Sequence, residues 1–145
     1  MSVPLVNLKS KIDTEDVRMF MLDRTVADNT LDMDLTFSDE EIGVATRFAA
    51  MGYNETTPYV HTVSPDSLPY GMCFLNGIAY YLYLGLLQKL MRNDIDYSAG
   101  NVTVDLNKRR IEHLMKIMPM FKQEFEQKST QQKAAININN GYRRY

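Results

Sequence analysis

The segment from residue 68 to residue 92, LPYGMCFLNGIAYYLYLGLLQKLMR, decides the fold, because no charged residue occurs between Asp66 and Lys89. Such a run forms either a helix buried on all sides in a soluble protein or a membrane span, which needs about 20 apolar residues. Asn76 lies in its middle, glycines interrupt it, and its tyrosines occur mid-segment rather than at the ends, where the aromatic belts of membrane helices form. These features favour a central buried helix over residues 68–92. Its glycines would let neighbouring helices approach closely.

Two capped helices are predicted before this segment. Asp13 is a suitable N-cap for a helix over residues 14–24, because its side chain can accept a hydrogen bond from an early backbone amide. Ser38 and Glu41 form a capping box that starts a second helix over residues 38–51, with a glycine available to close it. The apolar residues at helical spacing are Val17, Phe20 and Met21 in the first helix, and Ile42, Ala45, Phe48 and Ala49 in the second.

The hydrophobic period changes after the central segment. Residues 95–106 alternate apolar and polar side chains around a Ser-Ala-Gly-Asn turn, which predicts a β-hairpin. An amphipathic helix follows over residues 107–128, with an apolar face of Ile111, Leu114, Met115, Met118 and Phe125. Residues 1–12 and 130–145 are predicted to be extended arms around a domain over residues 13–129. The predicted class is mainly α: a small helical bundle around a long central apolar helix, with one short β-hairpin and extended terminal arms.

Composition and charge indicate one globular domain with an uneven charge distribution. The 145 residues are 45% hydrophobic and 23% charged, the single cysteine rules out an internal disulfide, and residues 1–12 lack the apolar core of a signal peptide. Residues 1–66 carry 12 acidic and 5 basic side chains, a balance of −7, whereas residues 67–145 carry 6 and 11, a balance of +5. This asymmetry is either incidental or a sign that copies meet head to side through complementary charge.

No pattern typical of an enzyme occurs in the sequence. It has no nucleophile motif, Gly-rich phosphate loop or metal-ligand spacing, so we predict no catalytic, cofactor-binding or metal site. The acidic run at residues 39–41 is explained by the capping box, and Cys73 by burial in the central helix. His113 is expected to be solvated on the final helix, and His61 lies in a loop with no identifiable partner. We therefore expect a binding protein and not an enzyme.

Three features exceed what a self-contained monomer needs. Lys108, Arg109 and Arg110 open the final helix, where the helix dipole disfavours positive charge, so this is either a solvated basic turn or a contact with phosphate or an acidic neighbour. The C-terminal arm and the hairpin carry residue types common in interfaces. The predicted interface residues are Ile136, Ile138, Tyr142, Arg143, Arg144 and Tyr145 in the arm, and Tyr97, Val102 and Val104 in the hairpin.

Four stretches follow one another in a distinctive order: VRMFMLDR at 17–24 with Asp28-Asn29 after it, LDMDLTFSDEEI at 31–42, YSAGNV at 97–102 and NINNGY at 137–142. Together they resemble the small helical connector (adaptor) proteins at the head–tail junction of tailed bacteriophages. The stretches are similar, in turn, to the opening helix and loop, the entry to the second helix, the turn after the central helix and the C-terminal arm. Asn101 and Asn140 depart from the glycine that is commoner in that family.

The resemblance implies an assembly role. Such proteins form a homo-oligomeric ring, twelve-fold by the resemblance, beneath the portal protein, extend the DNA channel, and offer a platform to the next neck or tail-completion protein. The C-terminal arm would reach into the portal, and residues 108–110 could face viral DNA that passes without sequence-specific binding. The expected location is the virion neck after assembly in the host cytoplasm, with no membrane partner. A small helical DNA-binding protein and a membrane-associated protein are the alternatives, and a pI near 5.7 argues against the first.

Overall fold

The computed structural model describes residues 10–25, 27, 35–92 and 106–142. Within these ranges it contains the α-helices α1 (Thr14–Met21), α2 (Asp39–Glu55), α3 (Met72–Arg92) and α4 (Leu106–Tyr142), and the short 3-10 helix η2 (Pro65–Ser67). The predicted mainly α class is confirmed, and no β-strand occurs in the described ranges.

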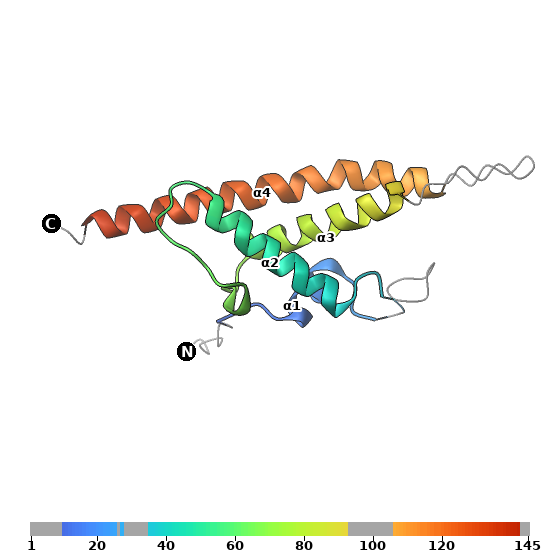
Figure 1. Ribbon diagram of the computed structural model, residues 1–145, viewed down its shortest axis with the longest axis horizontal. Coiled ribbons are helices and arrows are strands. Elements are labelled where there is room, and N and C mark those ends of the chain that lie inside the picture. Colours follow the sequence, from blue (N-terminus) through green and yellow to red (C-terminus); the bar gives the residue numbers. More distant parts are fainter. Residues whose placement is uncertain (1–9, 26, 28–34, 93–105, 143–145) are drawn as a thin grey trace, which may run out of the picture.

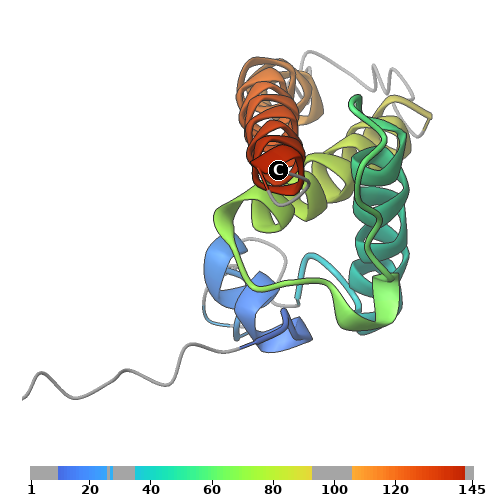
Figure 2. The ribbon, with the colours of Figure 1, turned by 90° about the vertical axis from the view of Figure 1, so that its left-hand side faces the viewer.

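Helix α3 packs against each of the other three α-helices. Helix α4 is the longest helix of the described chain, and α3 lies along one side of part of it; the end of α3 and the start of α4 lie at the same end of the molecule (Figure 1). Figure 2 views α4 nearly end-on, with α2 and α1 on other sides of α3. Residues 73–79 of α3 are all buried, but Gly85, Gln88 and Lys89 are exposed, so only the first half of the helix is enclosed on all sides.

Local capping signals place the starts of α1 and α2 correctly. The Asp13 carboxylate accepts a hydrogen bond from the Asp16 amide at 3.0 Å, and the Asp16 carboxylate accepts one from the Asp13 amide at 2.9 Å. The predicted box at Ser38 is also present: its hydroxyl accepts from the Glu41 amide at 3.1 Å, and the Glu41 carboxylate accepts from the Ser38 amide at 2.9 Å. Each box satisfies amides that the first helical turn leaves unpaired.

The other boundaries of α1, α2 and α3 differ from the prediction. Helix α1 ends at Met21, and α2 continues past residue 51 to Glu55. Helix α3 begins at Met72 rather than residue 68, because the preceding residues form extended backbone that pairs with residues 10–12. The Ile12 amide donates to the Leu68 carbonyl at 2.9 Å, which ties part of the predicted N-terminal arm to the domain.

The prediction of an extended C-terminal arm from residue 130 is wrong for residues 130–142. Helix α4 continues without interruption from Leu106 to Tyr142 and includes Pro119. The spacing of Ile136 and Ile138 suggested a strand, but the turns before them are fixed by burial of Ser129 and Lys133 against the rest of the domain. The predicted hairpin at residues 95–106 lies outside the described residues, except that Leu106 begins α4.

A stripe of residues spaced by four joins α4 to the domain: Phe121, Phe125, Ser129 and Lys133. The ring of Phe121 lies 6.1 Å from the ring of Phe20 and 5.5 Å from that of Tyr83, between centroids. One turn later, Phe125 is buried in the core. The Ser129 hydroxyl oxygen lies 3.3 Å from the Cys73 sulfur and donates to the Phe125 carbonyl at 2.6 Å.

The ring of Phe125 occupies space that a side chain at Gly77 would fill. A Cβ atom built on Gly77 would lie 2.7 Å from two atoms of this ring, closer than nonbonded carbon atoms approach. Gly52 of α2 approaches the same ring, since a Cβ there would lie 3.3 Å from it and 2.8 Å from the Tyr81 hydroxyl. Gly71 and Gly85 have nothing within 4 Å of such an atom. The expected close approach therefore occurs at Gly77 and not along the whole helix.

A buried arginine that the sequence pattern did not indicate joins α1 to the start of α2. The Arg18 guanidinium donates to the Asp23 carbonyl at 3.2 Å and to the Asp39 carboxylate at 2.7 Å. The Asp23 carboxylate in turn accepts from the Thr36 and Phe37 amides at 2.9 and 3.0 Å. The chain that enters α2 is thereby held in place by charge-assisted hydrogen bonds.

We predict that Gly77→Ala destabilises the fold by about 1–3 kcal/mol, because the added methyl group overlaps the buried ring of Phe125. Gly85→Ala, in the same helix but facing open space, serves as the matched control. It should leave stability unchanged or raise it by up to about 1 kcal/mol, because alanine favours helix over glycine. Urea unfolding of both variants measures the difference, and equal stabilities would show that the contact does not constrain the packing.

Candidate interaction surfaces

The single cysteine and the two histidines, the side chains best suited to catalysis or metal binding, do not form a common site. Cys73 is buried, and burial raises the pKa of its thiol, which disfavours the reactive thiolate. His61 is exposed, with its Nδ1 3.4 Å from the Tyr53 hydroxyl, a partner that the sequence did not reveal. His113 is exposed on α4. The described ranges contain no group of three side chains that could hold a metal ion.

No helix in the described part of the chain combines the length and apolar character required to cross a bilayer. The long apolar segment that suggested this alternative ends with exposed polar residues at Gln88, Lys89 and Arg92. Its apolar side chains instead face the other helices, where they form much of the core.

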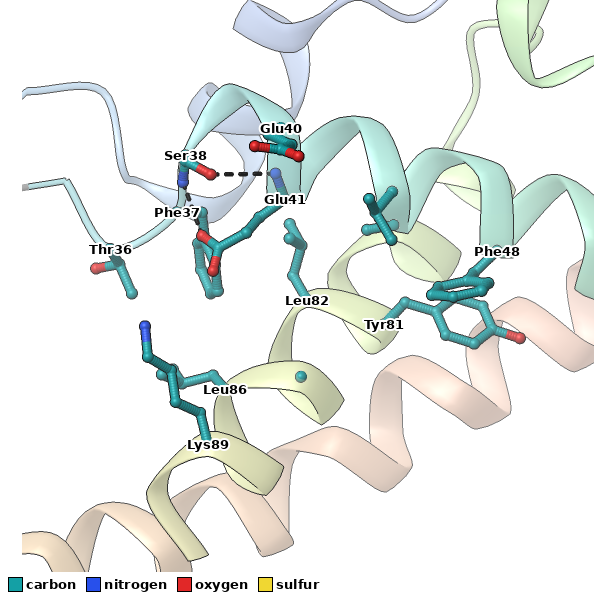
Figure 3. Close-up of a pocket in the computed structure, with 13 residues that line it drawn as sticks. Thr36, Phe37, Ser38, Glu40, Glu41, Phe48, Tyr81, Leu82, Leu86 and Lys89 are labelled. Carbon is teal, nitrogen blue, oxygen red and sulfur yellow. Dashed lines mark hydrogen bonds between the residues drawn. The ribbon is translucent and has the colours of Figure 1, made fainter. Parts of the chain in front are cut away.

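A groove of about 430 Å³ lies between α2 and α3 (Figure 3). Its floor is apolar and is formed mainly by Val44, Phe48, Tyr81, Leu82 and Leu86. The rim on the α2 side carries Glu40 and Glu41, and Lys89 of α3 lies at one end of the opening. We refer to these residues together as the α2–α3 groove. None of its lining residues comes from α4.

One residue of the groove floor, Phe48, was predicted to be in the core but is only partly covered. Phe48 was placed on the apolar face of α2, yet 47% of it is exposed. Its ring lies 5.7 Å from the ring of Tyr81, which covers one side. Gly85 leaves the floor open on the α3 side, since it has no side chain to fill the space. An apolar floor of this size is typical of surfaces that bind another molecule.

The rim of the α2–α3 groove carries a net negative charge. Asp39, Glu40 and Glu41 form the first turn of α2, where the helix dipole stabilises negative charge. Asp39 is bound to Arg18, and Glu41 also serves in the capping box. Glu40 is exposed beside the floor. Two carboxylates and one ammonium group at the opening leave a negative balance that would attract a basic partner.

The C-terminal half of α4 is attached to α2 by a buried lysine. Lys133 is fully buried, and its ammonium group donates to the Asn54 and Thr56 carbonyls at 3.3 and 2.5 Å. These carbonyls lie at the C-terminal end of α2, where the helix dipole favours a cation. The Lys133 nitrogen also lies 4.7 Å from the centroid of the Tyr53 ring, a cation–π geometry. Burial lowers the pKa of Lys133 below its usual value.

The same end of α2 fixes the loop that follows it. The Asn54 side chain donates to the Val63 carbonyl at 3.0 Å and accepts from the Val63 amide at 2.8 Å. These two bonds resemble those of a strand pair, although residues 59–63 form no strand. The loop, α2 and α4 therefore meet around Asn54 and Lys133.

The predicted arm residues lie beyond this attachment. Ile136 is half-buried and lines a cavity of about 240 Å³ together with His61 and Tyr70. Ile138 is 57% exposed. Tyr142 is the last residue of α4, and residues 143–145 lie outside the described ranges.

Of the other predicted contact residues, those at the start of α4 are described by the structure and those of the hairpin are not. Lys108, Arg109 and Arg110 are exposed near the start of α4, as a contact surface requires. The hairpin residues Tyr97, Val102 and Val104 lie outside the described ranges.

The apolar face predicted for the final helix is only partly buried. Met115, predicted to be on this face of α4, is instead 57% exposed. Only Leu114 and Phe125 of that predicted face are buried.

We predict that Lys133→Met lowers the free energy of unfolding by about 1–3 kcal/mol, because two carbonyls at the end of α2 lose a charged donor. Lys128→Met is the matched control. Its ammonium group makes only a partly exposed pair with Glu124 at 3.6 Å, so its loss should change stability by less than about 0.5 kcal/mol. Thermal unfolding of both variants tests this, and equal midpoints would contradict an anchoring role for Lys133.

Comparison with known proteins identified no relative of the chain. No protein family model, curated protein or solved structure matches the chain. The described part of the chain thus offers three candidate interaction surfaces: the α2–α3 groove, the basic start of α4 and the end of α4 beyond Lys133.

Proposed function

We propose that the protein is a structural virion subunit that forms a homo-oligomeric ring at the head–tail junction of a tailed bacteriophage. In this role it docks on the portal protein, extends the DNA channel and presents a platform to the next neck or tail-completion protein. The proposal rests on the resemblance of four sequence stretches and on one feature of the structure, the projecting end of α4.

The projecting end of α4 is the observation that carries the proposal. Among the described residues of α4, Lys133 is the last one with a buried side chain. The helix continues beyond it for about two further turns to Tyr142. Figure 1 shows these turns extending past the end of α2. Residues 137–141 are all exposed, and they include the apolar Ile138. A projecting helix with an exposed apolar residue is suited to insert into a neighbouring molecule.

The composition of this end favours a binding role over a stabilising one. Residues 137–141, Asn-Ile-Asn-Asn-Gly, are poor helix formers. They bury little surface of their own, so they add little to the stability of the domain. The family-like C-terminal arm is thus proposed to act as a helix at least as far as residue 142, and not as an extended strand.

The remaining surfaces fit the same role. Residues 108–110 are exposed and are proposed to face the DNA channel, where contacts with phosphate would be independent of sequence. The predicted hairpin at residues 95–106 is proposed to contact an adjacent subunit or the tail, through Tyr97, Val102 and Val104. Neither contact requires a cofactor or a reaction.

The exposed basic turn also favours a second candidate, a small DNA-binding protein. A dedicated DNA-binding protein needs a basic surface that covers a whole face, and the overall pI near 5.7 does not support one. A gel-shift assay with duplex DNA at low salt separates the two functions. Tight binding by the isolated chain would favour the second candidate.

We predict that deletion of residues 134–145 leaves helix content and thermal stability nearly unchanged but abolishes attachment to the portal ring of the encoding phage. The deletion keeps Lys133 and its bonds to α2, so the domain should still fold. Co-sedimentation with purified portal rings measures attachment, and circular dichroism measures the fold.

A point variant provides a sharper version of the same test. Ile138→Asp places a charge on the exposed apolar position and should weaken attachment, whereas Thr130→Asp, at an exposed position before Lys133, should not. Attachment of the deletion variant at the strength of the full chain would refute the proposed role of this helix end.

A further inference from the structure

We propose that the α2–α3 groove of one copy binds the exposed face of the first turns of α4 of the next copy. This inference rests on the proposed function, because it identifies the surface through which ring subunits meet. It assigns Lys108 and Arg109 to an acidic neighbouring subunit instead of the DNA channel, and it leaves Arg110 as the residue of this basic turn that faces the channel. It commits to a second copy of this chain as the occupant, on grounds of charge and of apolar complementarity.

The groove presents one half of a complementary pair. Its floor is apolar around Phe48 and Tyr81, and its rim carries Glu40 and Glu41. Phe48 remains 47% exposed within a single copy, so a partner that covers it would gain the free energy of burying apolar surface. The acidic rim disfavours nucleic acid as that partner and favours a basic segment.

The first turns of α4 present the other half. Lys108 and Arg109 are exposed there, and Lys116 is exposed further along the helix. Met115 is 57% exposed. Lys108 and Met115 are seven residues apart and therefore lie on the same helix face, two turns from each other. A methionine side chain is flexible enough to fill an irregular apolar floor, while the lysine would reach the acidic rim.

The placement of the two surfaces suits a ring. The groove is lined by α2 and α3, and the proposed occupant lies on α4, so the contact joins two different surfaces of the same molecule. Such a heterologous contact repeats from copy to copy and closes into a ring when its rotation permits. It also sets acidic side chains from residues 1–66, whose balance is −7, against basic side chains from residues 67–145, whose balance is +5.

Charge reversal tests the pairing. Glu40→Lys alone, and Lys108→Glu combined with Arg109→Glu, should each weaken self-association at low ionic strength by at least tenfold, because like charges then face each other. A chain that carries all three substitutions should regain association, since the opposite charges meet again with their signs exchanged. Glu55→Lys, an exposed reversal at the other end of α2, is the matched control and should leave association unchanged. Sedimentation velocity over a concentration series measures each variant.

Gly85→Leu gives an independent test of the groove. No atom lies within 4 Å of a Cβ at this position, so the leucine side chain can occupy the groove without disturbing the fold. It should block association while circular dichroism stays unchanged.

Two results would overturn the inference and are distinguishable from each other. If the full chain associates but the reversals have no effect, or the triple variant fails to recover, copies meet elsewhere and the ring proposal stands. If the full chain remains monomeric at every concentration, both this inference and the ring proposal fail.

Discussion

The contact between the ring of Phe125 and the backbone of Gly77 determines how the helices of this protein pack. Because two ring atoms lie only 2.7 Å from the position that a Cβ on Gly77 would take, α4 can approach α3 more closely than it could if residue 77 had a side chain. Gly52 of α2 approaches the same ring, so three helices converge on one aromatic side chain. Once Phe125 is fixed, the next positions of the α4 stripe follow at intervals of four residues. Ser129 then meets Cys73, and Lys133 reaches the end of α2.

Both ends of α2 are held by buried basic side chains, and this arrangement leaves its middle open. Arg18 binds Asp39 in the first turn, and Lys133 binds the carbonyls of the last turn. Neither Arg18 nor Lys133 lines the groove in which Phe48 lies. Since α4 packs along a different side of α3, it does not fill the space there. The α2–α3 groove is therefore a consequence of how α2 is anchored, and its apolar floor remains available to a partner.

The sequence predicted the features that depend on neighbouring residues. The N-cap at Asp13 and the capping box at Ser38 depend on residues close in sequence, and both are present; the structure shows in addition that Asp16 completes a box at Asp13. The mainly helical class and the burial of residues 73–79 likewise follow from local composition. The long-range features were not predictable in this way. A lysine at residue 133 gives no sign that it is buried, because its partners are carbonyls about 80 positions earlier in the chain. The buried role of Arg18 depends on Asp39 in the same manner.

The errors at the candidate surfaces share a physical cause. Phe48 and Met115 lie at helical spacing with core residues, but periodicity does not tell how wide the buried stripe of a helix is. The two isoleucines at 136 and 138 suggested a strand, yet a helix already anchored at Lys133 extends by adding one hydrogen bond for each residue fixed. Among residues 134–141 only Ala134 and Ile136 are partly buried, so the last turns gain little from packing within one copy. The stripe from Phe121 to Lys133 holds the domain together, whereas the turns after it are the part of the helix that we propose for attachment to a neighbour.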